Sequence, residues 1–230
     1  MKHDVAKPNV AQTAKALMEI YDCLHKAYGP QGWWPADSAE EVVIGAILTQ
    51  NTAWTNVEQA IAELKRAGRL TFHAIDGLEE DALAELIRSA GTFRQKAAYL
   101  KSFARWLVEE HNGSLGAALS GELDSVRTKL LALKGIGPET ADAIMLYAGN
   151  HPTFVVDAYT KRVLRRHFLI EPEQTDYETV RGLFMDSLQP DVQLFNEYHA
   201  LFVEVGKRHC KAVANCEGCP LAHLEHEGSL

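Results

Sequence analysis

The chain has 230 residues, enough for one or two domains with a sizeable core, and 47% of them are apolar and 23% charged. The longest apolar run, residues 42–48, is too short to span a bilayer, and residues 1–10 lack the apolar stretch of a secretory signal. This composition disfavours a membrane protein, a secreted disulfide scaffold, a coiled coil and a disordered tail. We expect a cytoplasmic protein with no membrane partner.

The net charge of −8 argues weakly against a nucleic-acid partner, because contacts to phosphate need cations. The charges are segregated, however: basic residues gather in residues 94–101, 161–166 and 207–211. A solvated surface explains any one of these clusters, whereas three of them allow a basic stripe on an acidic protein. The net charge therefore leaves nucleic-acid binding open.

Most of the chain is predicted to be helical. Leu17, Ile20 and Leu24 have helical spacing and predict a helix that stops at Gly29 and Pro30. Later helices are marked by capping signals. These are capping boxes at Ser38 with Glu41 and at Thr175 with Glu178, and C-cap glycines at Gly68, Gly91 and Gly113. The one strand-like run, residues 153–156, is too short for a sheet, so we expect an all-α protein of about ten helices.

Residues 133–142, with the sequence LKGIGPETAD, predict two helices joined by a tight turn. The first helix ends near Leu133, the turn is Gly135-Ile136-Gly137, and Pro138 opens the second helix. Two glycines let the backbone approach a ligand, and the free amides of the second helix favour a phosphate. The alternative interpretation is a plain helical hairpin with a glycine turn.

A loop over residues 149–157 follows the hairpin and ends in Asp157, which begins a basic helix over residues 158–166. An aspartate in this place can be a simple N-cap. Together, the hairpin, the loop and the aspartate resemble the signature of the helix-hairpin-helix (HhH-GPD) DNA glycosylase superfamily, to which endonuclease III belongs. Residues 48–52, 91–98 and 111–113 are similar to that family too, and the resemblance covers roughly residues 31–220.

The resemblance implies a bilobal all-α fold. A six-helix, barrel-like domain over residues 31–149 would carry the hairpin, and residues 1–30 and 150–230 would form a second helical domain with a Cys-rich C-terminal loop. Double-stranded DNA would lie across the cleft, with the damaged nucleotide flipped into a pocket between the lobes. The residues expected to contact DNA are Gln50, Gly135, Ile136, Gly137, Thr140, Lys161 and Arg162.

The family's catalytic aspartate corresponds to Asp157. Hydrolysis of an N-glycosidic bond develops oxocarbenium charge on the sugar, which a carboxylate stabilises while it orients or deprotonates the attacking water. Gln50 resembles the residue that, in endonuclease III, fills the gap left by the flipped nucleotide; a plain polar residue at a helix C-terminus is the equal alternative.

Family members that also cleave the DNA backbone use a lysine amine to form a Schiff base with the sugar. In endonuclease III that lysine directly precedes the Thr-Ala of the second hairpin helix, where this chain has Glu139. A carboxylate forms no imine, and nearby Lys134 does not match the family position. We therefore expect a monofunctional, water-using glycosylase.

Three of the four tryptophans, Trp33, Trp34 and Trp54, lie within 22 positions of one another. Core packing is the alternative for each of them. Tryptophan rings also sandwich bases and attract cations, and alkylation at N3 or N7 makes a purine cationic. The Trp-Trp-Pro and the aromatic after Gln-Asn-Thr are similar to the 3-methyladenine DNA glycosylase III branch. The base pocket expected from that similarity consists of Trp33, Trp34, Pro35, Trp54 and Glu139.

Cys210, Cys216 and Cys219 form a C-terminal group, whereas Cys23 is expected to be a buried structural thiol. Many endonuclease III relatives hold a [4Fe–4S] cluster there with four cysteines, but here Glu225 stands near the place of the fourth. Three interpretations stay open: a cluster completed by another ligand, a zinc site, or a loop without metal. The candidates for the fourth ligand are His223, Glu225 and His226.

These patterns predict a monomeric, cytoplasmic and nucleoid-associated enzyme that excises alkylated purines of the 3-methyladenine type. Three alternatives remain: a bifunctional endonuclease III-type enzyme for oxidised pyrimidines, a non-catalytic DNA-binding module, and a cluster-based redox sensor.

Overall fold

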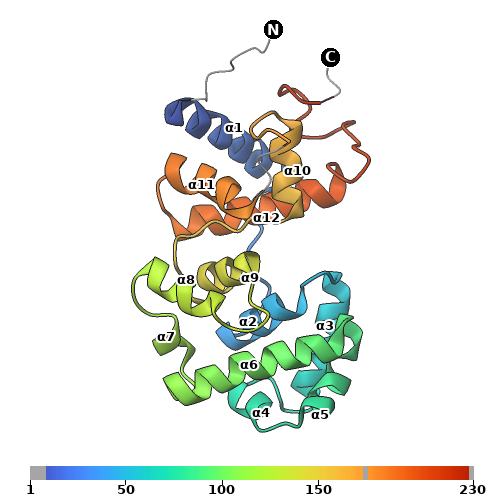
Figure 1. Cartoon of the computed structure of the whole chain (residues 1–230). Helices are drawn as coiled ribbons and strands as arrows, with labels where there is room; N and C mark the ends of the chain where they lie inside the picture. Colours follow the sequence, from blue (N-terminus) through green and yellow to red (C-terminus); the bar gives the residue numbers. More distant parts are fainter. Residues whose placement is uncertain (1–8, 173–175, 228–230) are drawn as a thin grey trace. The chain divides into compact units, whose positions relative to one another are not determined.

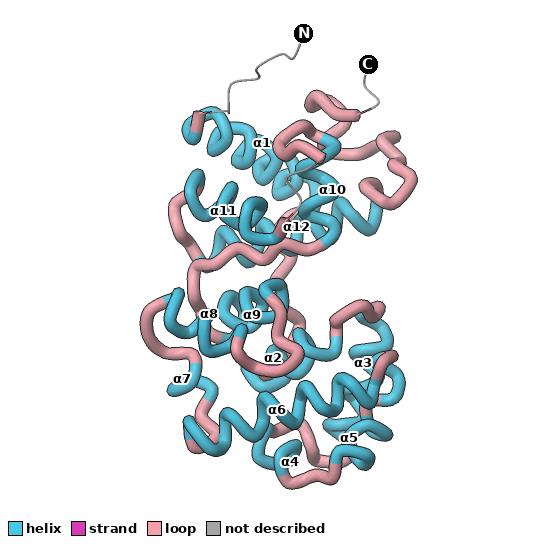
Figure 2. The backbone as a smooth tube through the Cα atoms, in the orientation of Figure 1, coloured by secondary structure: helices cyan, strands magenta, loops and turns pink. Residues whose placement is uncertain are grey.

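The structure is a computed structural model that describes residues 9–172 and 176–227. The described residues contain helices and loops and no strand, which confirms the all-α prediction (Figures 1 and 2). The chain divides into two compact units. Trp34–His151 form the central unit, and the described residues of Met1–Trp33 and Pro152–Leu230 form the terminal unit.

The central unit is built around the long helix α6 (Phe93–His111). Its apolar residues recur at helical spacing, so one face of α6 is buried against α2, α4, α5 and α7. The buried side chains of that face include Ala97, Leu100, Phe103, Ala104 and Leu107. The other elements of this unit are α2 (Ala39–Leu48), α3 (Trp54–Arg66), α4 (Phe72–Asp76), α5 (Glu80–Leu86), η1 (Arg88–Ala90), α7 (Leu115–Ala118), α8 (Leu123–Leu131), α9 (Pro138–Ala143) and η2 (Ile144–Ala148).

The terminal unit joins the two ends of the chain. It contains α1 (Val10–Tyr28), α10 (Ala158–Arg166), α11 (Tyr177–Ser187) and α12 (Val192–Arg208). Helix α12 packs on α1 and α10, and α1 packs on α11. Aromatic rings form the centre: Phe154 and Phe184 stack 3.6 Å apart, and the buried Tyr198 hydroxyl donates to the Leu17 carbonyl at 2.6 Å. Chain segments far apart in sequence thereby share one core.

The predicted helix ends are largely those of the structure. Helix α1 ends at Gly29, and Ser38 accepts from the Glu41 amide at the start of α2. The Ser38 capping box is only half formed, because the Glu41 carboxylate accepts from the Asp37 amide instead of the Ser38 amide. The box predicted at Thr175 lies outside the described residues, and Asp176 caps α11 there.

The C-cap glycines are found near the predicted ends. Gly68 follows α3, Gly91 follows η1, and Gly113 comes one residue after α6 has ended at the left-handed Asn112. The expected number of about ten helices is too low, since the described residues hold twelve α-helices. Helices of four or five residues, such as α4 and α7, are too short to show a periodicity. No described helix is long and apolar enough to cross a membrane.

A buried lysine on α6 connects two segments of the central unit. Lys96 is 1% exposed, and its ammonium donates to the carbonyls of Leu48 and Ala90 at 2.8 and 2.6 Å and to the Thr52 hydroxyl at 2.5 Å. Burial lowers the pKa of Lys96 to about 8. The ammonium therefore holds the segment after α2 against the turn at η1.

Lys96→Met is expected to lower the free energy of unfolding by about 3 kcal/mol, because buried oxygens lose their donor. Urea unfolding measures the change. Lys129→Met is the control, because this lysine is exposed on α8 and its loss should change stability by less than about 0.5 kcal/mol. Equal stability of the two variants would contradict the role given to Lys96.

Candidate functional site

The predicted hairpin is formed by α8, a turn and α9. Gly135 has φ +84°, and a Cβ there would lie 2.1 Å from Cγ of the Tyr99 ring. Only glycine fits this conformation and this close approach. Gly137 is the N-cap of α9 with φ −88°, Pro138 is the first helical residue, and a Cβ on Gly137 would meet no atom within 4 Å. The turn therefore has one tightly packed side and one open side.

The two glycines offer a matched pair of variants. Gly135→Ala is expected to destabilise the central unit by about 2–4 kcal/mol, from positive φ and from overpacking against Tyr99. Gly137→Ala meets neither obstacle and should cost less than about 1 kcal/mol. Thermal unfolding of both variants checks the difference, and equal melting temperatures would show that the turn is not as tight as described.

A buried ion pair joins the two helices of the hairpin. Arg127 on α8 donates through Nε and Nη2 to the two carboxylate oxygens of Asp142 on α9, each at 3.0 Å. The side chains are 12% and 0% exposed. A bidentate pair of this geometry fixes both the separation and the rotation of the helices.

Gln50 is bound to the hairpin. Its Nε2 donates to the Gly135 carbonyl at 2.9 Å and to the Thr140 hydroxyl at 3.1 Å. Thr140 is buried at 7% exposure, and Ile136 in the turn is buried at 5%. Three of the residues expected to contact DNA therefore take part in the internal structure of the hairpin, namely Gly135, Ile136 and Thr140. Gln50 is a fourth, and it links the hairpin to the segment after α2.

Two of the expected base-pocket residues lie together in the central unit. The Trp34 ring meets the Trp54 ring edge to face, with centroids 5.3 Å apart and planes at 83°. Trp34 also contacts Tyr147, at 5.2 Å and 53°. A Cβ on Gly45 of α2 would lie 3.3 Å from the Trp34 ring, so the glycine leaves room for the indole. Trp34, Trp54 and Tyr147 are hereafter the aromatic cluster.

Sequence reasoning missed Tyr147. It lies on η2, a π-helical turn that directly continues α9, and sequence patterns do not indicate such a turn. Trp54 is held by a hydrogen bond from its indole N–H to the Glu58 carboxylate at 2.9 Å. Trp33, in contrast, belongs to the terminal unit, where the Lys207 ammonium lies 5.7 Å from its ring centroid. Pro35 and Glu139 are exposed, Glu139 in the first turn of α9.

Asp157 is the N-cap of α10 in the terminal unit. Its Oδ1 accepts from the amide and the hydroxyl of Thr160, at 2.7 and 2.9 Å. Its Oδ2 lies 3.8 Å from Nε2 of His199, and the carboxylate side chain is 14% exposed. One oxygen is thus used for capping, and the other faces a histidine that sequence reasoning did not single out.

The basic helix α10 holds the C-terminal loop. Arg162 donates to the Cys210 carbonyl at 2.6 Å, and its guanidinium lies 5.1 Å from the Tyr159 ring. Hydrogen bonds from Thr179 are the largest cause that lowers the pKa of Asp176, and the charge of Lys161, on the same helix as Arg162, lowers it further. Arg162 therefore supports the terminal unit's own structure.

The Cys-rich loop does not present four ligands to a metal centre. Within the described residues no group of three or more His, Cys, Asp or Glu side chains is arranged to hold an ion. The Cys210 sulfur accepts from Arg166 at 3.1 Å. His223, a candidate fourth ligand, lies 3.6 Å from the Cys23 sulfur, and His226 packs against His167 with ring centroids 5.7 Å apart. The donor set therefore does not fit a four-ligand cluster.

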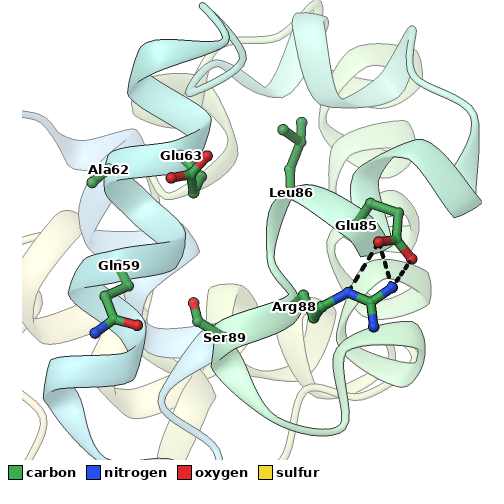
Figure 3. Close-up of a pocket in the computed structure, with 7 residues that line it drawn as sticks. All are labelled: Gln59, Ala62, Glu63, Glu85, Leu86, Arg88 and Ser89. Carbon is green, nitrogen blue, oxygen red and sulfur yellow. Dashed lines mark hydrogen bonds and ion pairs between the residues drawn. The ribbon is translucent and has the colours of Figure 1, made fainter.

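A shallow pocket of about 390 Å³ lies between α3, α5 and η1 (Figure 3). Its wall carries the ion pair of Arg88 with Glu85, shown dashed, together with Glu63. None of the predicted site residues lines this pocket.

Comparison with known proteins identifies the family. The profile of "HhH-GPD superfamily base excision DNA repair protein" matches residues 44–190, which include the hairpin and Asp157. The chain belongs to the HhH-GPD superfamily. It is therefore a DNA glycosylase, an enzyme that hydrolyses N-glycosyl bonds, and the resemblance found in the sequence is confirmed.

Relatives within the HhH-GPD superfamily cover most of this chain. A Methanocaldococcus jannaschii protein named "Putative DNA repair glycosylase MJ1434" is 43% identical over 206 residues, 89% of this chain and 93% of its own. Endonuclease III of Thermotoga maritima is 29% identical over 77% of this chain and 78% of its own.

Solved structures agree with this assignment. H. pylori 3-methyladenine DNA glycosylase (MagIII) bound to 1,N6-ethenoadenine is 28% identical with a TM-score of 0.73, covering 85% of this chain and 97% of that one. A non-covalent endonuclease III–DNA complex has a TM-score of 0.79 at 24% identity, covering 94% and 96%, and shows the shared fold.

Proposed function

We propose that this glycosylase excises alkylated purines of the 3-methyladenine type from double-stranded DNA and leaves the abasic strand uncut. The observation that carries the proposal is the aromatic cluster of Trp34, Trp54 and Tyr147. We also propose that it acts as a monomer.

The aromatic cluster suits a cationic base. Methylation at N3 or N7 places positive charge on a purine, and the faces of tryptophan and tyrosine rings attract cations. Stacked bases lie about 3.4 Å apart, so a sandwich needs parallel rings separated by about 7 Å. Trp34 and Trp54 are nearly perpendicular, with centroids 5.3 Å apart. The base therefore stacks on one ring face, with the other rings as side walls.

Asp157 supplies the charge for the reaction. As the alkylated base leaves, positive charge develops on the sugar, and the carboxylate stabilises it and orients the water that attacks the anomeric carbon. The cationic base is already a good leaving group and needs little help from an acid. Asp157 Oδ2, which is not used for capping, is the oxygen assigned to this task.

Glu139 supports hydrolysis without strand cleavage. It occupies the first turn of α9, where the resemblance to endonuclease III places the Schiff-base lysine. A carboxylate has no nitrogen with which to form an imine, so water is the nucleophile. The similarity to the H. pylori 3-methyladenine DNA glycosylase supports the proposed substrate class.

The hairpin is proposed to grip the DNA backbone through its turn. The open side at Gly137 leaves room for a phosphate, while Gln50 and the Arg127–Asp142 pair fix the turn from within. No step of the proposed reaction uses the Cys-rich loop.

The substrate class is tested by measuring free base released from duplexes that carry 7-methylguanine, 3-methyladenine or thymine glycol. Release of the methylated purines alone supports the proposal. Release of thymine glycol alone would contradict it and favour the endonuclease III-type alternative.

The role of the aromatic cluster is tested at Trp54. Trp54→Leu is expected to slow excision of a cationic methylpurine by about tenfold, the size of a desolvated cation–π contact. Trp54→Phe keeps a ring and should lose less. Neutral 1,N6-ethenoadenine is the control base, because its binding gains nothing from charge. Equal losses for cationic and neutral bases would reject the cation–π account.

A further inference from the structure

His199 is a buried histidine beside the proposed catalytic carboxylate. It lies on α12 with 6% of its surface exposed, and its Nε2 is 3.8 Å from Oδ2 of Asp157. Oδ1 of Asp157 accepts two bonds from Thr160, so the imidazole faces the oxygen that is left for chemistry.

Backbone packing sets this distance. Helices α10 and α12 pack so closely that a Cβ on Gly206 would lie 2.2 Å from Cδ1 of Tyr159. Asp157 is fixed at the start of α10 by its capping bonds, and His199 is fixed because it belongs to the buried face of α12. Rigid elements, not mobile side chains, therefore hold the imidazole and the carboxylate close together.

Burial lowers the pKa of His199, and the negative charge of Asp157 opposes that effect. The imidazole is therefore neutral at neutral pH. Helices α10 and α1 pack on α12, which carries His199. From α10 the facing charge is Asp157; Arg162 on that helix binds the Cys210 carbonyl. From α1, Asp22 raises the pKa of the neighbouring Tyr198. Of these groups, Asp157 acts on His199 and raises its pKa against the effect of burial.

We propose that His199 is a positioning residue for Asp157, whose neutral imidazole leaves the carboxylate available for the reaction and whose protonation in acid switches excision off. The imidazole takes its proton from solvent, and the imidazolium then pairs with Oδ2 and cancels its charge. The oxocarbenium character of the sugar is no longer stabilised in that state. This inference rests on the proposed catalytic role of Asp157.

The test compares single-turnover rates of methylpurine release between pH 4.5 and 8 for the wild type, His199→Gln and His199→Asn. The cationic substrate keeps its charge over this range. The wild-type rate should fall about tenfold per pH unit below its inflection. The variants should stay active to lower pH, so that their rate relative to the wild type rises about tenfold per unit. His25→Gln, on α1, is the control and should keep the wild-type profile.

Two results would overturn the inference. One is that the excision rates of folded His199→Gln and His199→Asn fall at low pH along the same curve as the rate of the wild type. The second is independent of activity and of the folding of those variants: the NMR titration of His199 in Asp157→Asn. Loss of the aspartate charge should lower the pKa of His199, and an unchanged value rejects the pairing. Full activity of Asp157→Asn would instead reject the proposed catalytic role of Asp157, on which this inference rests.

Discussion

Asp157→Asn is expected to slow excision of alkylated purines by about 10³-fold while the protein stays folded. The amide oxygen of asparagine accepts the same two bonds from Thr160, and asparagine is as good an N-cap as aspartate. The substitution therefore removes the negative charge that faces the reaction and little else. Single-turnover release of methylated base measures the rate, and thermal unfolding verifies the fold.

Asp157→Ala separates the two roles of this residue. It loses the cap as well as the charge, so it should be as inactive as Asp157→Asn and also less stable by about 1 kcal/mol. Excision by Asp157→Asn at a tenth of the wild-type rate or more would show that Asp157 is only a helix cap. The alternative of a non-catalytic DNA-binding protein predicts no activity in the wild type either.

Asp142→Ala is expected to lower the free energy of unfolding by about 3–5 kcal/mol. The substitution leaves the Arg127 guanidinium, only 12% exposed, without the carboxylate that accepts two of its bonds. Because this pair joins α8 to α9, DNA affinity should fall together with stability. Chemical denaturation and a binding titration on undamaged duplex DNA measure the two effects.

The double variant Arg127→Met with Asp142→Leu is the matched control. Replacement of a buried ion pair by apolar side chains of similar volume is often neutral or stabilising, so much of the lost stability should return. If the double variant is as unstable as Asp142→Ala, the damage comes from lost shape and not from an uncompensated charge.

The fold, and the place of Asp157 at the start of the helix that follows the hairpin loop, could be predicted because their signals are local. Glycine and proline mark the hairpin turn, apolar spacing marks the helices, and Asp157 follows at a recognisable distance. The tryptophan pattern predicted one pocket for Trp33, Trp34 and Trp54. The structure brings the rings of Trp34 and Trp54 into contact, whereas Trp33 belongs to the terminal unit.

Contacts between distant segments left no such signal. Tyr147 reaches the aromatic cluster from a π-helical turn, and His199 reaches Asp157 from a helix more than forty residues later. Gln50 was interpreted as the residue that fills the gap left by a flipped nucleotide or as a plain polar residue at a helix C-terminus. The sequence did not indicate that its amide binds the hairpin. Each of these depends on which helix packs on which, and that arrangement is a property of the whole core.

The most direct test of the central claim follows the fate of the strand after base release. A duplex with one methylated purine is incubated with the enzyme in the presence of borohydride, and the products are resolved with and without alkali. Strand breaks that appear only after alkali, with no trapped protein–DNA adduct, are the predicted result. Strand cleavage without alkali, together with a borohydride-trapped adduct, would contradict the account and show that a lysine amine attacks the sugar.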